Sequence, residues 1–245
     1  MPIDVLIPLG PNDEDIIERC VESVRTYILG VRNIYIVSSR PVQVKGATQV
    51  FDESIFPFTK NQIGTMVLEK RAGWYLQQLI KLYGPLLIPG CLPDCLIVDA
   101  DVIFFQRLRF MDGNKYLFDK NNETHPPYFA HMKRLHSSFL PAYPRTSGIV
   151  NLMIYNQEIL KELFKVVETH HKKEFWRVFL EQVAPNEFSG ASEYEIYFHY
   201  ICRVHKQRVL LRPLRYSNFG LRSNIQSGDW HYVTYHHHFQ KKPSK

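Results

Sequence analysis

The sequence has few cysteines and no long run of hydrophobic residues. Its four cysteines are dispersed along 245 residues, which argues against a disulfide framework and favours reduced thiols. No segment is apolar over the length that a membrane span requires, and the opening stretch MPIDVLIPLG lacks the basic region of a signal peptide. We therefore expect a cytoplasmic protein without a transmembrane segment.

Long basic runs and the common nucleotide-binding motifs are also missing. The formal net charge is +6, but the basic residues are scattered, so nucleic-acid binding is not favoured. No Gly-x-Gly-x-x-Gly follows the first predicted strand and no Walker motif is present, which counts against NAD and P-loop ATP chemistry. A mild positive excess instead suits small anionic ligands such as nucleotide diphosphates.

Hydrophobic periodicity predicts strands that alternate with helices over the first hundred residues. The predicted strands cover 3–9, 33–39, 48–51 and 95–105, and the predicted helices cover 12–29 and 65–84. The dipeptide Gly84-Pro85 is expected to end the second helix. Alternation of this kind predicts an α/β protein with a largely parallel central sheet flanked by helices, as in Rossmann-like folds.

The second half of the chain is more mixed, with no internal repeat and no low-complexity linker. Here the pattern predicts a strand at 147–156, helices at 157–171 and 192–204, and extended segments at 208–214 and 230–238. With 45% hydrophobic residues, the chain is expected to form a single domain spanning 1–245. Ligands of parallel sheets bind beyond the carboxyl ends of the strands, so Pro8, Leu9 and Ser38 are expected to line a nucleotide site.

Two aspartates interrupt the apolar segment CLIVDADVIFFQ (95–106). In a continuous strand Asp99 and Asp101 would point the same way, and two adjacent buried carboxylates are costly. A divalent cation with oxygen ligands, Mn²⁺ or Mg²⁺, would neutralise both. The alternative is a strand that ends at Val98, with both acids solvated in a turn. The apolar residues on both sides favour the metal.

Four motifs in order along the chain resemble the GT-A nucleotide-sugar glycosyltransferases. They are LIVDADVIFF, TSGIVNLMIYN, SGASEYEIYFHY and TYHHHF. In that family the Asp-x-Asp motif holds Mn²⁺ or Mg²⁺ on the diphosphate of the donor, most often a UDP-sugar. The resemblance implies a nucleotide-binding half (1–106), an acceptor-binding half (107–245), and a donor-sugar contact from Ser147 and Gly148.

The resemblance also implies a basic residue on the helix before the Asp-x-Asp strand that reaches the diphosphate or the acids. Arg71 is our candidate, because a guanidinium can pair bidentately with phosphate or carboxylate. Trp74 is a second donor-site candidate, since it follows a helix-disfavoured Gly73 that permits close approach of a ligand. The alternative for both is a solvated helix face.

Acids and histidines of the second half complete the predicted site. Ser192 and Glu195 fit a capping box, which leaves Glu193 as the candidate base that takes the proton of an acceptor hydroxyl in an inverting reaction. In a retaining reaction Glu193 need not be the base. Neutral imidazole is a good Mn²⁺ ligand, and His236 and His238 share one face of the last predicted strand.

The sequence therefore predicts a metal-dependent glycosyltransferase that moves a sugar from a nucleotide diphosphate sugar to a hydroxyl of a glycan or small-molecule acceptor. Two alternatives stay open. One is a nucleotidyltransferase of the same topology, although the acidic PLGPNDED loop differs from the basic, glycine-rich loop usual there. The other is an inactive module that binds glycan or nucleotide without turnover.

Overall fold

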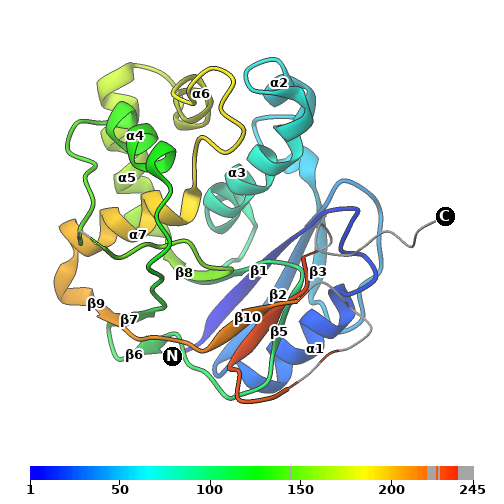
Figure 1. Ribbon diagram of the computed structural model, residues 1–245. Coiled ribbons are helices and arrows are strands. Elements are labelled where there is room, and N and C mark those ends of the chain that lie inside the picture. Colours follow the sequence, from blue (N-terminus) through cyan, green and yellow to red (C-terminus); the bar gives the residue numbers. More distant parts are fainter. Residues whose placement is uncertain (144, 220–224, 226, 237–245) are drawn as a thin grey trace.

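A five-stranded sheet forms the centre of the molecule (Figure 1). The computed structural model describes residues 1–143, 145–219, 225 and 227–236. The strand order is β3-β2-β1-β4-β8, with β3, β2, β1 and β4 parallel and β8 antiparallel to β4. The strands are β1 (Ile3–Leu9), β2 (Val31–Ser38), β3 (Gln49–Asp52), β4 (Asp94–Val98) and β8 (Leu152–Asn156). The predicted α/β class with a largely parallel central sheet is confirmed.

Helices cover both faces of this sheet. Figure 1 shows α1 on one side and α3 on the other, with α4, α5, α6 and α7 gathered beyond α3. The helices are α1 (Ile17–Tyr27), α2 (Lys60–Gly64), α3 (Ala72–Leu87), α4 (Pro126–Leu135), α5 (Gln157–His171), α6 (Phe175–Glu181) and α7 (Glu193–Val204), with 3₁₀ turns η1 (Glu53–Ile55), η2 (Glu69–Arg71) and η3 (Lys206–Arg208). Coverage of both faces explains why β1 is buried along its whole length.

The buried carboxylate of Asp4 ties down the amino-end edge of the sheet. Arg32 donates to it from Nε at 3.0 Å and from Nη2 at 2.6 Å. The backbone N–H groups of Asn33 and Leu92 donate to it at 3.1 and 2.7 Å. Because four donors satisfy this carboxylate, Asp4 has a structural role. Asp99 and Asp101, which lack such a set of donors among the described residues, lie at the carboxyl-end edge of the sheet.

Helix α3 runs past the predicted end at Gly84-Pro85. Its last residue is Leu87, and Pro85 lies inside the helix. A Cβ on Gly84 would lie 2.2 Å from Cδ2 of Leu6, so the glycine marks the place where α3 packs directly on β1. The expected stop at Gly84 was wrong, because here the residue serves close packing and does not end the helix.

Two small sheets complete the fold. One has the order β10-β11-β5 and the other β6-β7-β9. Their strands are β10 (Tyr216–Asn218), β11 (Tyr232–Thr234), β5 (Val102–Phe104), β6 (Met111–Asp112), β7 (Lys115–Phe118) and β9 (Val209–Leu211). Because β5 pairs antiparallel with β11, the first and second halves of the chain share a sheet. Among the helices in the part of the chain that the structure describes, none is long and apolar enough to cross a bilayer.

The buried histidine of α4 predicts a loss of stability in acid. Burial lowers the pKa of His131 to about 4, and its Nε2 lies 2.8 Å from the carbonyl oxygen of Phe179, to which a neutral ring donates. As pH falls below about 6.5, His131 becomes protonated in the unfolded chain but stays neutral in the folded protein. The free energy of unfolding therefore falls until pH approaches 4.

Urea unfolding of wild type and His131→Gln at pH 7 and pH 5 measures this effect. Gln keeps a donor for Phe179 but does not titrate, and all other groups are shared by the two proteins. We expect wild type to lose about 2 kcal/mol more than the variant between these pH values. Parallel pH profiles would show that His131 is not the titrating group.

Candidate functional site

Asp99 and Asp101 lie in a turn at the carboxyl end of β4. The predicted single strand over 95–105 was wrong: β4 ends at Val98, and β5 begins at Val102 in a different sheet. The N–H of Val102 donates to the carbonyl of Asp99 at 3.1 Å, which closes the turn. Asp99 is 19% exposed in its side chain and Asp101 is 7% exposed as a residue. The acids are therefore in a turn but largely shielded from solvent.

The turn lies where the order of the parallel strands reverses. Strand β1 has β2 on one side and β4 on the other, and the chain moves from β1 outward to β3 before it returns to β4. In open α/β sheets, ligands bind in the crevice outside the carboxyl ends of the strands at such a switch point. The Asp pair after β4 and Asp13 after β1 both belong to this edge.

Asp99 forms an ion pair with a lysine of α3 that the sequence analysis did not single out. Nζ of Lys81 lies 2.6 Å from Oδ1 of Asp99 and 2.7 Å from Oε1 of Glu193, the first residue of α7. Lys81 and Glu193 are each 4% exposed. Tyr194 donates from its hydroxyl to Asp99 Oδ1 at 3.3 Å, and its ring centroid lies 4.3 Å from Lys81 Nζ. A single buried cation thus joins two carboxylates from distant parts of the chain.

Burial and the ion pair act in opposite directions on the pKa values of Asp99 and Lys81. Burial raises the pKa of Asp99 to about 6, although Lys81 acts to lower it. Burial also acts to lower the pKa of Lys81, but Asp99 and Glu193 outweigh it and hold that pKa above its usual value. Lys81 therefore stays protonated and fixes both carboxylates.

Asp101 has a different partner, the histidine that follows β11. Nδ1 of His236 lies 3.0 Å from Oδ2 of Asp101. Burial lowers the pKa of His236, whereas the hydrogen bond and charge of Asp101, with smaller effects of Asp99 and Asp13, raise it above its usual value. The pairing of β11 with β5, continued by the bond from Tyr235 N to Asp101 O at 3.1 Å, brings this histidine to the acids. The predicted His238 lies outside the described residues.

Asp101 and His236 are better placed than Asp99 to hold a divalent cation. Asp101 Oδ2 and His236 Nδ1 lie 3.0 Å apart, so these two side chains together would hold a divalent cation, with His236 as the neutral ring. Asp99 directs Oδ1 at Lys81 and Tyr194. Within the described part of the chain, no three His, Cys, Asp or Glu side chains are already arranged as a metal site. The remaining ligands of a cation would therefore come from a substrate or from water.

Ser147 and Gly148 are held by Glu195, a residue that the sequence analysis set aside. Ser147 donates from Oγ to Glu195 Oε1 at 2.7 Å, and Gly148 donates from N to Oε2 at 2.8 Å. His199, one turn along α7, places Nε2 3.0 Å from the same Oε2. The predicted cap by Ser192 is present, but the Glu195 carboxylate is engaged with this loop. Glu195 positions a segment beside the Asp pair, because Asp99 N donates to Asn151 O at 2.9 Å.

Arg71 does not reach the acids, contrary to the expectation for that helix. Its Nε donates to the carbonyl of Phe188 at 2.8 Å and its Nη2 to Ser189 Oγ at 3.3 Å. The guanidinium lies against the ring of Trp74, 4.0 Å from the centroid. Lys81, roughly 15 Å further along the axis of α3, is the basic residue that pairs with Asp99. Of the two, Lys81 is the basic residue that contacts an acid of the motif, and a contact of Arg71 with a diphosphate stays a prediction.

The strand ends proposed for the nucleotide lie together at the carboxyl edge. Leu9 pairs in register with Ser38, and Pro8 with Val37. The side chains of Pro8, Leu9 and Ser38 are buried, so backbone groups are what this edge would offer to a ligand.

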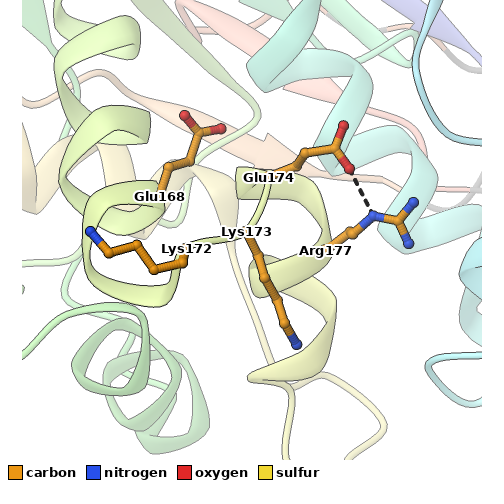
Figure 2. Close-up of a pocket in the computed structure, with 5 residues that line it drawn as sticks. All are labelled: Glu168, Lys172, Lys173, Glu174 and Arg177. Carbon is orange, nitrogen blue, oxygen red and sulfur yellow. Dashed lines mark hydrogen bonds and ion pairs between the residues drawn. The ribbon is translucent and has the colours of Figure 1, made fainter.

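A surface pocket lies elsewhere, between α5 and α6 (Figure 2). Its lining residues are Glu168, Lys172, Lys173, Glu174 and Arg177. Several of these charges are already satisfied: Arg177 pairs with Glu174 at 2.7 Å and Lys173 with Glu181 at 2.8 Å. None of the residues around the Asp pair lines it, so we place the candidate site at the sheet edge.

The fold and site define a mixed α/β protein with a cluster of carboxylates around a buried lysine at the switch point of a parallel-rich sheet. The chain belongs to the family of unknown function DUF6492, whose model matches residues 16–213. The matched region includes Lys81, Asp99, Asp101 and Glu193 and stops before His236. No curated protein matches the chain in sequence.

Proposed function

We propose that this protein is a metal-dependent glycosyltransferase of GT-A-like fold that transfers a sugar from a nucleotide diphosphate sugar, in our interpretation a UDP-sugar, to an acceptor hydroxyl. The observation that carries the proposal is the convergence of Asp99, Asp101, Glu193, Lys81 and His236 at the switch point of the sheet. Ligands of this sheet type bind there. The four motifs that resemble the GT-A glycosyltransferases also occur in the same order as in that family.

The charge of the cluster leaves a place for a cation. Three carboxylates, Asp99, Asp101 and Glu193, face one lysine and one histidine, and Asp13 adds negative charge to the field at His236. Asp101 and His236 would hold Mn²⁺ or Mg²⁺, with Asp99 acting through water or the ribose. The bound ion would supply charge neutralisation for the diphosphate leaving group.

Glu193 is our proposed base for an inverting reaction. Its carboxylate takes the proton of the acceptor hydroxyl while that oxygen bonds to the anomeric carbon. The bond from the anomeric carbon to the phosphate oxygen breaks, and the nucleoside diphosphate leaves with the electron pair. Lys81 orients Glu193 through the ion pair at 2.7 Å. Ser147 and Gly148, fixed by Glu195, would border the donor sugar.

A non-catalytic binding module is the second candidate, and one observation favours it. Lys81 and His236 already give Asp99 and Asp101 partners from within the chain, so the acids are tolerated without an external ion. A protein that has lost turnover would keep such an arrangement and bind nucleotide or glycan only.

Thermal shift with UDP, GDP or CDP and Mn²⁺, followed by donor-sugar hydrolysis, tests the proposal. We expect one nucleotide with Mn²⁺ at a hundredfold excess over its Kd to raise the Tm of wild type by roughly 5–10 °C. Asp101→Asn should lose most of this shift and at least tenfold in hydrolysis. Asp112→Asn is the control, since it changes an exposed acid on β6.

The outcomes separate the candidates. Binding that Asp101→Asn abolishes, together with hydrolysis, supports a transferase, whereas binding without turnover of any donor supports the module. If wild type neither binds a nucleotide diphosphate with Mn²⁺ or Mg²⁺ nor hydrolyses any nucleotide sugar, the glycosyltransferase proposal is wrong.

A further inference from the structure

Arg71 is held rigidly between two aromatic rings at the start of α3. Its Cζ lies 4.0 Å from the ring centroid of Trp74 and 4.3 Å from that of Phe188. Hydrogen bonds to Phe188 O at 2.8 Å and Ser189 Oγ at 3.3 Å fix the plane of the guanidinium. Since these contacts use Nε and one N–H of Nη2, the group still has donors to offer in a fixed orientation.

No carboxylate of the described residues pairs with this guanidinium. The neighbouring Lys70 also lacks one within the same part of the chain, and its Nζ lies 5.3 Å from the Phe188 ring centroid. Burial lowers the pKa of Arg71, which reports a cation removed from water without a compensating anion. Two adjacent cations beside one ring thus form a positive site without an ion-pair partner among the described residues.

Arg177 shows what a compensated arginine of similar geometry looks like in this protein. It stacks on Trp176, with Cζ 4.4 Å from the ring centroid, and its Nε bonds Glu174 at 2.7 Å, drawn as the dashed line in Figure 2. Stacking on an aromatic ring is common to both arginines, and the carboxylate partner is what Arg71 lacks. Arg71 thus has the aromatic contact of Arg177 without an ion pair to a described residue.

Phe188 makes this surface suitable for a sugar. Its side chain is 51% exposed, and aromatic rings that stay in water at a charged site stack on the apolar faces of ligands. A ligand bound here would combine an apolar ring face with an anionic group. A carbohydrate that carries a carboxylate or phosphate has both.

The surface adjoins the candidate site through Tyr128 and the segment before α7. The charges of Glu193 and Arg71 both act on the hydroxyl of Tyr128, so this tyrosine is near both. Gly190, two residues from Phe188, donates to the hydroxyl of Tyr75 at 3.1 Å. The start of α3 lies roughly 14 Å along the axis from Lys81, so one ligand that reaches both places must be extended.

We propose that Lys70, Arg71, Trp74 and Phe188 bind the anionic group of an extended acceptor, an oligosaccharide that carries a carboxylate or phosphate, while its reacting hydroxyl lies at Glu193. This inference rests on the proposed transferase function, because the oligosaccharide is an acceptor only if the protein transfers a sugar to it. Binding of an acidic oligosaccharide, however, is measured without donor or metal, so the two proposals fail separately.

Isothermal titration calorimetry with three probes tests the site. The probes are a hexasaccharide of alternating glucuronic acid and N-acetylglucosamine, a 6-phosphorylated mannose trisaccharide, and the neutral hexasaccharide of N-acetylglucosamine. Each is titrated alone and with UDP and Mn²⁺. We expect one acidic probe to bind at least tenfold tighter than the neutral one, and the tighter of the two identifies the anion.

Variants assign the binding to the proposed residues. Arg71→Gln should weaken the acidic probe roughly ten- to a hundredfold, as expected for lost hydrogen bonds to a charged group. Phe188→Ala, which alters an exposed side chain and leaves the fold intact, should weaken both acidic and neutral probes. Arg177→Gln is the matched control and should change nothing.

Any of four results would overturn the inference. Equal affinity for acidic and neutral probes, or no binding of any probe in either condition, would show that no anionic acceptor is recognised. Unchanged binding in Arg71→Gln would place the site elsewhere. If Arg71→Gln weakens UDP and spares the oligosaccharides, Arg71 belongs to the donor site.

Discussion

Replacement of Lys81 by Met is expected to lower the free energy of unfolding by about 3–5 kcal/mol. The change leaves Asp99 and Glu193 near each other without the cation that joins them at 2.6 and 2.7 Å. Breaking a buried ion pair on one side is costly because an uncompensated charge stays in a medium of low polarity. Here two carboxylates lose the same partner, so we expect the upper part of the usual range.

Urea unfolding at neutral pH measures the effect, and the chain offers two controls. Lys161→Met removes the exposed partner of Glu158 on α5 and should cost less than about 1 kcal/mol. The triple variant Lys81→Met, Asp99→Asn, Glu193→Gln removes the charges together and should recover at least 2 kcal/mol of the loss. A loss below 1 kcal/mol for Lys81→Met alone would contradict the buried bridge.

Replacement of Gly148 by Ala is expected to destabilise the protein by about 3 kcal/mol, at the upper end of the usual cost of overpacking. A Cβ at this position would lie 2.5 Å from Phe198 Cβ and 2.9 Å from the carbonyl oxygen of Tyr194. Both atoms belong to the rigid part of α7, so a side-chain rotation cannot relieve the clash. The loop must move away from α7, which also pulls Gly148 N from Glu195.

Gly73→Ala is the matched control, because the nearest atom to its added Cβ is Lys60 Cε at 3.7 Å. Gly73 is exposed in the first turn of α3, so the change should be neutral or stabilise by up to about 1 kcal/mol. Urea unfolding compares the two variants, and the shift of Tm with nucleotide and Mn²⁺ reports on the site. Equal stability of the two variants would show that the contact of Gly148 with α7 is loose.

Periodicity predicted the central sheet well because its strands obey local rules. The run IDVLIPL is apolar except for Asp4 and is a strand with the predicted bounds 3–9, and α5 matches the predicted 157–171. Helices α4 and α6 carried no prediction. Their periodicity is weak or short: α6 has seven residues, five of them buried, so no polar face reveals it. Helix α3 begins and ends later than predicted. Its later end arises because Gly84 packs on Leu6 and does not stop the helix.

The site was predicted in part for a physical reason. A carboxylate in an apolar segment signals that something compensates its charge, and Asp99 and Asp101 were found on that basis. The identity of the compensating group depends on tertiary contacts, since Lys81 is 18 residues before Asp99 in sequence. A signal existed nonetheless: Lys81 is a lone lysine among Leu79, Ile80, Leu82 and Tyr83, on a part of α3 that could only be buried.

Glu195 illustrates the limit of a motif. Ser192 and Glu195 match a capping box, and the Ser192 half of it is present. The carboxylate nevertheless accepts from Ser147 and Gly148, more than forty residues away. A local pattern names one use for a side chain, and nothing in the spacing shows that a distant segment will compete for it.

The antiparallel register of β11 against β5 has a consequence for how the protein is made. Thr234 sits opposite Val102, which brings His236 to Asp101 across more than a hundred intervening residues. A ribosome delivers the acidic turn long before it delivers the imidazole, so a nascent chain carries Asp101 without its partner until β11 docks. Premature termination before this strand would leave the acidic turn without the imidazole that pairs with Asp101.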